Sequence, residues 1–165
     1  MFWDKTIILV LPVMVFAMWA QHRVRTTYQR YLQVQAGRGL SGSEAARRLL
    51  DAAGLHDVEI EQIDGLLTDH YDPRRRTLFL SRENYHGRSV AALGVACHEA
   101  GHAAGGEFDA SNRAIRLLAH HGIVTRQEQG MVKQVLGAAA LTYVAGALMA
   151  VAQLVRLVLL RGGRY

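Results

Sequence analysis

Apolar residues gather at both ends of this 165-residue chain, and the stretch between the ends is polar. Near the N-terminus, Thr6–Ala20 (TIILVLPVMVFAMWA) is an apolar run with Trp3 and Trp19 at its borders. A transmembrane helix needs about 20 apolar residues, with a range of roughly 17–25, and tryptophan favours the membrane–water boundary. The run is slightly short by this measure, but it predicts an uncleaved membrane anchor. A cleaved signal peptide is the alternative, although no clear A-x-A cleavage site follows.

A second uncharged segment, Gly137–Ala152, lies near the C-terminus between Lys133 and Arg156. It belongs to a helix expected from Gln127 to about Leu160. Its many alanines and glycines suit close helix–helix contact in lipid. We therefore expect this segment to span a membrane or to pack on the first apolar run. A buried helix of a soluble domain is the alternative.

Between the two ends, the pattern changes from helical to strand periodicity. Ser41–Ala53 has apolar residues at helical spacing, with Ser43 as the expected N-cap and Gly54 as the stop. Val58–Ile63 alternates as a strand does. Residues 72–76 (DPRRR) are typical of a turn, and the segments on both sides of it predict a small antiparallel sheet of two or three strands. These flanking segments are Leu66–Tyr71 and Thr77–Ser81.

Helical patterns return after the predicted sheet. Ser89–Ala104 is an apolar helix that Gly105 and Gly106 end, and Glu107–His121 is a further helix that Gly122 ends. These elements predict an α+β fold that is mainly α. The expected division is an N-terminal membrane anchor (1–22), a central domain (23–126) and a C-terminal hydrophobic helix (127–165).

The charge distribution agrees with a membrane location. The formal net charge is +5, and Arg23, Arg25 and Arg30 follow the first apolar run. Positive flanks face the cytoplasm, so the central domain is expected on the cytoplasmic side of the cell membrane. No basic stripe interleaves with aromatic residues, so no nucleic-acid partner is expected. The single cysteine, Cys97, excludes an intrachain disulfide framework.

The candidate chemistry lies in residues 98–102 (HEAGH). His98 and His102 are four apart, so on a helix both imidazoles lie on one face and reach one zinc ion. Glu99 lies beside the metal, where its carboxylate can take a proton from zinc-activated water that attacks a peptide carbonyl. A helix of this kind after an antiparallel sheet is the arrangement of a zincin-like minimal domain, in which an edge strand binds the extended substrate. A pair of surface histidines on an ordinary helix is the alternative.

Catalytic zinc also needs a third protein ligand and an open position for water. Glu107, just after the Gly-Gly break, is the first candidate, and Asp109 is the second. An acidic residue also favours a helix N-terminus for purely structural reasons. His120 becomes a candidate only if its helix folds back. The remaining residues of this kind are expected to have structural roles. His121 is expected to be exposed and Cys97 to pack within its helix. His70 is expected to be a surface or turn residue, with substrate binding as the alternative.

Several stretches together resemble the neutral zinc metallopeptidases of bacterial membranes. The resemblance implies zinc, peptide hydrolysis and a membrane location, with His98, His102 and Glu107 as ligands and Glu99 as the catalytic base. The Glu-Phe-x-Ala segment also resembles the third-ligand helix of the membrane CAAX prenyl proteases, which supports Glu107 separately. The stretches are the N-terminal anchor, Gly42–Leu55, Leu67–Ser81 (LTDHYDPRRRTLFLS), Asn84-Tyr85, Ser89–Ala92, Val95–Ala103 (VACHEAGHA), Glu107–Ala114 (EFDASNRA) and Val135–Val144 (VLGAAALTYV).

The chain departs from that family in one large respect. Members usually place a long insert with membrane-spanning segments between the HExxH and EFDAS helices, and here only Ala103–Gly106 separate His102 from Glu107. The chemistry therefore requires the Gly-Gly turn to bring Glu107 to the metal. Gly105 matches the turn glycine of the extended metzincin motif HExxHxxGxxH, but the last position of that motif is Phe108, which cannot bind zinc.

The sequence thus predicts zinc-dependent hydrolysis of peptide bonds in protein or peptide substrates at or near membrane lipid. One alternative is a catalytically weak or inactive membrane-associated scaffold with a structural metal site, whose helices drive self-association. Another is a small soluble homo-oligomer in which the apolar ends pack against each other.

Overall fold

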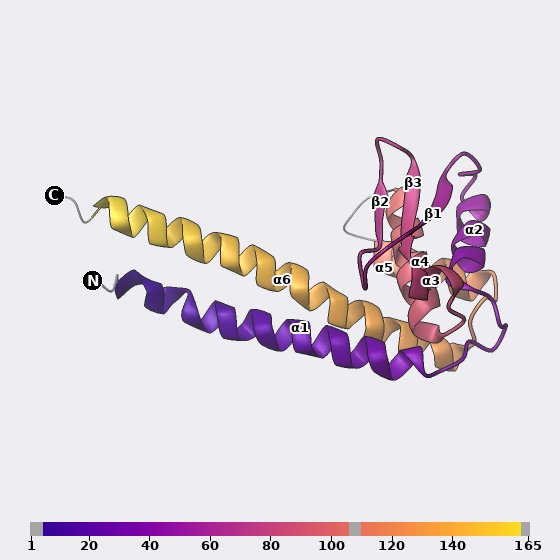
Figure 1. Cartoon of the computed structure of the whole chain (residues 1–165), viewed down its shortest axis with the longest axis horizontal. Helices are drawn as coiled ribbons and strands as arrows, with labels where there is room; N and C mark the ends of the chain where they lie inside the picture. The colour runs from indigo at the N-terminus through magenta and orange to yellow at the C-terminus, as the bar shows by residue number, and fades with distance from the viewer. Residues whose placement is uncertain (1–4, 106–109, 163–165) are drawn as a thin grey trace. The chain divides into compact units, whose positions relative to one another are not determined.

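The elements along the chain are mostly helices, with a small sheet in the first half (Figure 1). A computed structural model describes residues 5–105 and 110–162. The α+β, mainly helical fold with an apolar helix at each end is confirmed, and the short helix α3 was not expected. In chain order, the elements are a 3-10 helix at Lys5–Leu9, α1 (Leu11–Leu32), α2 (Gly42–Ala52), β1 (Glu59–Ile63), β2 (His70–Asp72), β3 (Thr77–Ser81), α3 (Arg82–His86), α4 (Val90–Ala103), α5 (Ala110–His120) and α6 (Arg126–Gly162).

Contacts within the chain define two compact units. One holds the described parts of residues 1–26 and 137–165, and the other holds the described parts of residues 27–136. The long helices α1 and α6 therefore each contribute residues to both units. The functional division predicted at residues 22 and 126 stays a prediction.

Helix α4 lies at the centre of the 27–136 unit, where it packs against α2, α3, α5 and the sheet. Cys97 is fully buried on this helix, which confirms its predicted packing role. Burial of a large apolar side chain stabilises a fold by roughly 1.5–3 kcal/mol, so this cluster holds α4 firmly in place. The buried core includes Leu93, Ala96, Cys97 and Ala100 of α4 with Leu49, Leu50, Leu78, Leu80, Leu118 and Val132 from its neighbours.

The three-stranded sheet has the order β1-β3-β2, with β3 in the middle and fully buried. Strands β2 and β3 pair antiparallel around the predicted 72–76 turn, in which the Asp72 carboxylate accepts a hydrogen bond from the Arg74 amide at 2.8 Å. The expectation of a wholly antiparallel sheet is wrong for β1, which pairs parallel to β3. The chain reverses between β1 and β2 and again before β3, so the first and third strands run the same way. The most apolar strand then takes the buried central position.

Helix α2 begins with a capping box, in which Ser41 and Glu44 bind each other's backbone amides at 3.2 and 2.8 Å. Ser41 is therefore the N-cap, and the expectation of Ser43 is wrong because the Ser43 hydroxyl donates to the Tyr85 carbonyl. Gly42 is required here, since a Cβ at this position would lie 2.1 Å from the Asn84 carbonyl oxygen. This close approach fixes α2 against α3.

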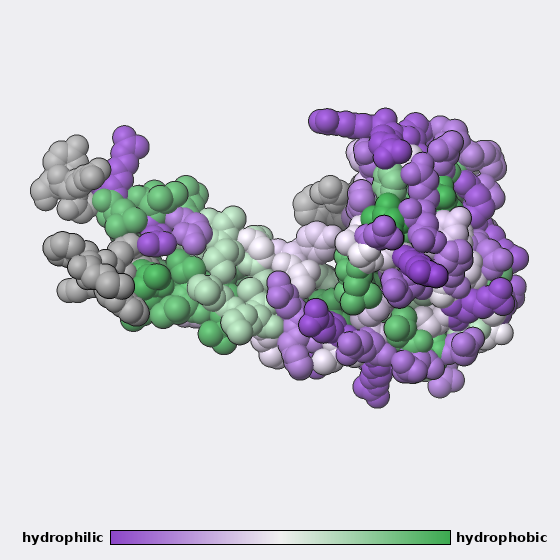
Figure 2. All heavy atoms as spheres, viewed as in Figure 1, coloured by the Kyte–Doolittle hydropathy of each residue, from purple (hydrophilic) through white to green (hydrophobic). Residues whose placement is uncertain are grey.

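Two helical stretches are long and apolar enough to cross a membrane, namely Ile7–Leu32 and Arg126–Arg161. Only 11% and 22% of their most apolar windows are buried, in contrast to a core helix of a soluble protein. In Figure 2, the described segments near both chain ends are mostly hydrophobic, whereas the surface of the 27–136 unit is largely hydrophilic. An apolar helix near each chain end is thus confirmed, and the first one continues to Leu32, beyond the predicted run that ends at Ala20.

Candidate active site

Helix α4, which carries His98, Glu99 and His102, is fixed at both ends. At its start, the Ser89 hydroxyl accepts a hydrogen bond from the Ala92 amide at 3.1 Å. At its end, Arg113 of α5 donates to the Ala104 and Gly105 carbonyls at 2.7 and 3.0 Å. Gly105 has φ +129°, which other residues rarely adopt, so the predicted glycine stop is confirmed at this residue. The contacts of Arg113 bind α5 directly to the end of the helix that bears the motif.

The two histidines converge through their Nε2 atoms, which lie 3.1 Å apart. Two nitrogen ligands of a tetrahedral zinc ion, each about 2.0–2.1 Å from the metal, lie about 3.3 Å from one another. The observed separation is close to this value, and the rings meet edge to face with centroids 4.6 Å apart. His98 and His102 therefore fit two positions of a zinc site.

Ser111 of α5 orients the first histidine, because its Oγ lies 3.0 Å from Nδ1 of His98. If Nδ1–H donates to this hydroxyl, Nε2 keeps its lone pair and faces Nε2 of His102. Such partners of the second ring nitrogen fix the tautomer and orientation of metal-binding histidines. Burial, and secondly the neighbouring His102, lower the pKa of His98 to about 4, so the ring is neutral as a metal ligand requires.

Glu99 lies beside the histidine pair, and one ligand atom from each of the three side chains falls within 4.8 Å of the others. Strand β2 packs against α4, and the backbone N–H of Tyr71 on this strand lies near the Glu99 carboxylate. Burial, and secondly the negative charge of Asp69, raise the pKa of Glu99 to about 8, and the nearby Tyr71 amide opposes this shift. A carboxylate with such a raised pKa is suited to proton transfer near neutral pH.

The other candidates from the sequence fall into two groups. Glu107 and Asp109 lie outside the described residues. His70 is exposed at the start of β2, where its ring stacks on Phe79 at 5.0 Å, in agreement with a surface role. His120 and His121 are exposed and contact each other at 5.1 Å. Within residues 5–105 and 110–162, the cluster of His98, Glu99 and His102 is the group of three side chains that could hold a metal.

Sequence reasoning did not single out Ser111, Tyr71 or Asp69. The Asp69 carboxylate accepts hydrogen bonds from the Ser81 amide and the Asn84 side-chain amide, both at 2.8 Å. All of these residues lie in or beside the stretches LTDHYDP, LFLS, NY and EFDAS that carry the family resemblance. Their position in these stretches is the sequence feature that could have indicated them. A single sequence, however, does not show which polar residue of each stretch faces the site.

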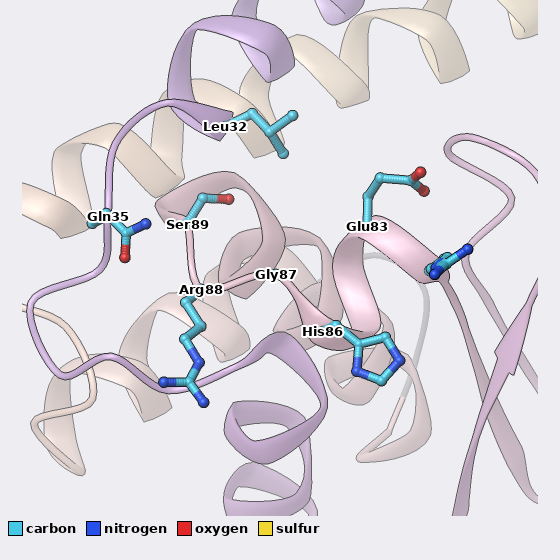
Figure 3. A pocket seen from close by; sticks show the side chains of 8 residues that line it. Leu32, Gln35, Glu83, His86, Gly87, Arg88 and Ser89 are labelled. Atoms are coloured by element: carbon cyan, nitrogen blue, oxygen red, sulfur yellow. The ribbon is translucent and has the colours of Figure 1, made fainter.

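A separate cavity of about 520 Å³ opens between the end of α1, helix α3 and the start of α4. Figure 3 shows Leu32, Glu83 and Ser89 around it. Neither histidine of the motif lines this cavity, and neither does Glu99. The candidate chemistry therefore lies on a different part of the unit, on the side of α4 that faces β2 and α5.

Comparisons with known proteins agree with this geometry. Residues 6–105 and 106–162 match the model of a family described as "putative neutral zinc metallopeptidase". The two matched segments meet between Gly105 and Gly106, within the short link between the HExxH and EFDAS stretches. The protein named "Putative membrane protease YugP" of Bacillus subtilis is 34% identical over an alignment of 214 positions, which covers 93% of this chain and 95% of the relative. No solved structure gives a significant match.

Proposed function

Because this chain belongs to that family of zinc metallopeptidases, we propose that it hydrolyses peptide bonds in protein or peptide substrates at the membrane, with zinc as its metal. The observation that carries the proposal is the convergence of His98 and His102, with Nε2 atoms 3.1 Å apart, beside the Glu99 carboxylate. The name of the Bacillus subtilis relative, a membrane protease, supports the same class of activity.

In the proposed reaction, His98 and His102 hold the ion and Glu99 moves the proton. Zinc bound there supplies a Lewis acid that lowers the pKa of water and polarises the scissile carbonyl. Glu99 takes a proton from the attacking water as the water oxygen bonds to the carbonyl carbon. It then delivers that proton to the nitrogen of the breaking C–N bond, so that an amine and a carboxylic acid leave. The Tyr71 amide, near the Glu99 carboxylate, favours its ionised form, which takes the proton from water.

Glu107 is the proposed third ligand. Ser111, four residues later, contacts His98 at 3.0 Å, and Arg113 contacts the last carbonyls of α4. The start of α5 therefore lies next to the histidine pair, and only a few residues of chain join Glu107 to it. This proximity supports the ligand role that the family resemblance implies.

We further propose that the two apolar stretches anchor the protein in the cell membrane. Ile7–Leu32 and Arg126–Arg161 have the length and the largely exposed apolar side chains that a bilayer requires. Arg23, Arg25 and Arg30 follow the first apolar run, which favours a cytoplasmic peptidase unit.

The test uses the full chain purified in detergent, with fluorescein-labelled β-casein as substrate. The wild type should contain zinc and cleave casein, lose cleavage with 1,10-phenanthroline, and regain it when zinc is returned. Glu99→Gln should retain zinc and lose about 10²–10⁴-fold in rate, the contribution of a general base. Glu59→Gln, at an exposed carboxylate of β1, is the matched control and should behave as the wild type.

Two results would contradict the proposed peptidase activity. Cleavage that is equal in Glu99→Gln and wild type would show that another protein in the preparation is the protease. Zinc bound by both proteins with no cleavage by either would favour the alternative of a membrane scaffold with a structural metal site.

A further inference from the structure

A row of buried and partly buried hydrogen bonds joins helix α1 to the segment beside the candidate active site. The Tyr28 hydroxyl of α1 donates to Oδ1 of Asn84 at 2.7 Å, and Nδ2 of Asn84 donates to Oδ2 of Asp69 at 2.8 Å. Ser81 contributes its backbone N–H to Oδ1 of Asp69 at 2.8 Å and its hydroxyl to both carboxylate oxygens at 3.1 Å. The Asp69 carboxylate is thus held by three different donor groups.

Asp69 is half-buried, and its partners in this row are buried. Asn84 and Ser81 are fully buried and Tyr28 is 3% exposed. Within the described part of the chain, no buried side-chain nitrogen or oxygen lacks a hydrogen-bond partner. Buried and fully paired polar groups admit few alternative arrangements, because any rearrangement leaves a donor or acceptor without a partner. The row therefore fixes Asp69 relative to α1, β3 and α3.

Asp69 stands directly before strand β2, which packs against α4, and two residues before Tyr71, whose N–H lies near the Glu99 carboxylate. Strand β2 has three residues and lies at the edge of the sheet, so it has a partner strand on one side only. Such a short edge strand has little backbone pairing to hold it. The side chain of Asp69 supplies a second attachment at the point where the chain enters the site.

We propose that Asp69 is a positioning residue of the peptidase site, and that Tyr28 and Asn84 act through it to hold the Tyr71 amide against Glu99. This inference rests on the proposed function for its catalytic part. It also assigns α1 a role beyond anchoring, because the hydroxyl of one α1 residue completes the row. Removal of that hydroxyl should loosen residues 69–72 without touching the histidines.

Two tyrosines of α1 allow a matched test. Tyr28→Phe removes the hydroxyl bonded to Asn84, and Tyr31→Phe removes one that donates to Gln134 at 2.7 Å and has no link to Asp69. Both side chains are buried, so each variant loses one hydrogen bond of equal length from the same helix. The full chain in detergent is examined by hydrogen–deuterium exchange of peptides that cover residues 68–73, by zinc content, and by kcat and KM on an internally quenched peptide copied from a casein cleavage site.

Tyr28→Phe should raise the exchange rate of residues 69–72 and lower kcat by about 2- to 10-fold, the range of one hydrogen bond, with KM and zinc content within twofold of wild type. Tyr31→Phe should leave both exchange and kcat unchanged. Asp69→Asn, which removes the charge and disturbs the pairing with Asn84, should change both quantities further in the same direction.

Equal exchange at residues 69–72 in the two tyrosine variants would overturn the positioning role. Faster exchange in Tyr28→Phe with unchanged kcat would overturn its catalytic part. If the wild type cleaves no peptide, the proposed function fails, and the exchange measurement still decides whether the row holds the Tyr71 amide.

Discussion

Two stretches of fourteen residues, Val90–Ala103 of α4 and residues 137–150 of α6, have similar compositions and opposite surroundings. At least half of each is alanine or glycine, and both are helical throughout. Nine residues of the α4 stretch are buried, but only Ala138 and Ala145 are buried in the α6 stretch. Small apolar residues therefore do not decide whether a helix is a core helix. Burial depends instead on the elements that pack around a helix, and α4 is surrounded by α2, α3, α5 and the sheet.

The polar residues of the two stretches differ accordingly. In α4, His98, Glu99 and His102 occupy one side of an otherwise apolar helix; Ser111 of α5 contacts His98, and the Tyr71 amide of β2 lies near Glu99. The α6 stretch contains no charged residue. A protein interior can stabilise a polar group by a fixed partner, whereas lipid cannot. The first helix therefore suits the proposed site, and the composition of the second suits an apolar environment.

The strongest way to break this comparison is to place a charge in each helix. Leu93→Arg buries a guanidinium in the core of the 27–136 unit, where the uncompensated charge should cost several kcal/mol and prevent recovery of folded protein. Leu148→Arg changes an exposed residue of α6 and should leave the 27–136 unit folded in detergent. In a bilayer it should oppose insertion by about 3 kcal/mol. Circular dichroism in detergent and a glycosylation-tag insertion assay in microsomes measure the two effects.

If Leu148→Arg instead unfolded the protein in detergent as Leu93→Arg does, α6 would be a core helix in the manner of α4. Normal insertion of the variant would count against a membrane span at this position.

The partner of His98 gives the next test. Ser111→Ala removes the hydroxyl 3.0 Å from Nδ1 and should weaken zinc binding by about 10- to 100-fold, the usual effect of such a partner. Thr142→Val is the matched control, because the Thr142 hydroxyl donates to the Ala139 carbonyl within α6, and the histidine pair lies on α4. Competition with a fluorescent zinc chelator measures both affinities. Equal zinc affinity in Ser111→Ala and wild type would show that the hydroxyl does not orient the ligand.

Local patterns predicted most of the fold. The helix of the motif, its stop at Gly105, the turn after Asp72 and the two apolar ends all depend on residues close in sequence. The S-x-x-E spacing of Ser41 and Glu44, typical of a capping box, also indicates the N-cap of α2, so the prediction of Ser43 was avoidable. The parallel pairing of β1 with β3 was not accessible, because strand direction depends on how residues 64–69 return the chain.

The site was predicted in part, for the same reason. The spacing of His98 and His102 on one helix fixes their convergence, so a single sequence suffices for that pair. Ser111 and Tyr71 reach the site from α5 and β2, and only tertiary packing brings them there. The proposed ligand Glu107 stays a prediction that rests on the family resemblance and on its closeness in sequence to Ser111.

Adding a larger side chain to each helix should give a smaller difference in stability between the two variants. Ala96→Leu adds volume at a fully buried position of α4 and should destabilise the folded unit by about 1–3 kcal/mol. Ala147→Leu adds the same volume at an exposed position of α6 and should have little effect. The single cysteine reports the difference, because Cys97 is buried beside His98 and burial raises the pKa of its thiol to about 12. Ala96→Leu should accelerate its reaction with DTNB, and similar rates in the two variants would argue against a tightly packed α4.

The smallest expected difference concerns glycines. In Gly94→Ala, the new Cβ would lie 3.6 Å from Val132, an ordinary van der Waals contact, so the methyl fits the core of the 27–136 unit. Alanine is favoured over glycine in a helix by about 0.5–1 kcal/mol because glycine loses more conformational entropy on folding. The variant should therefore raise the melting temperature by roughly 1–4 °C.

The control is Gly146→Ala, whose new Cβ meets nothing within 4 Å. A helix in lipid or detergent stays helical when the rest of the protein unfolds, so no change in melting temperature is expected. Thermal unfolding followed by DTNB reaction of Cys97 measures both variants. An equal rise in the two would mean that α6 unfolds together with α4, as a helix of the same soluble core does.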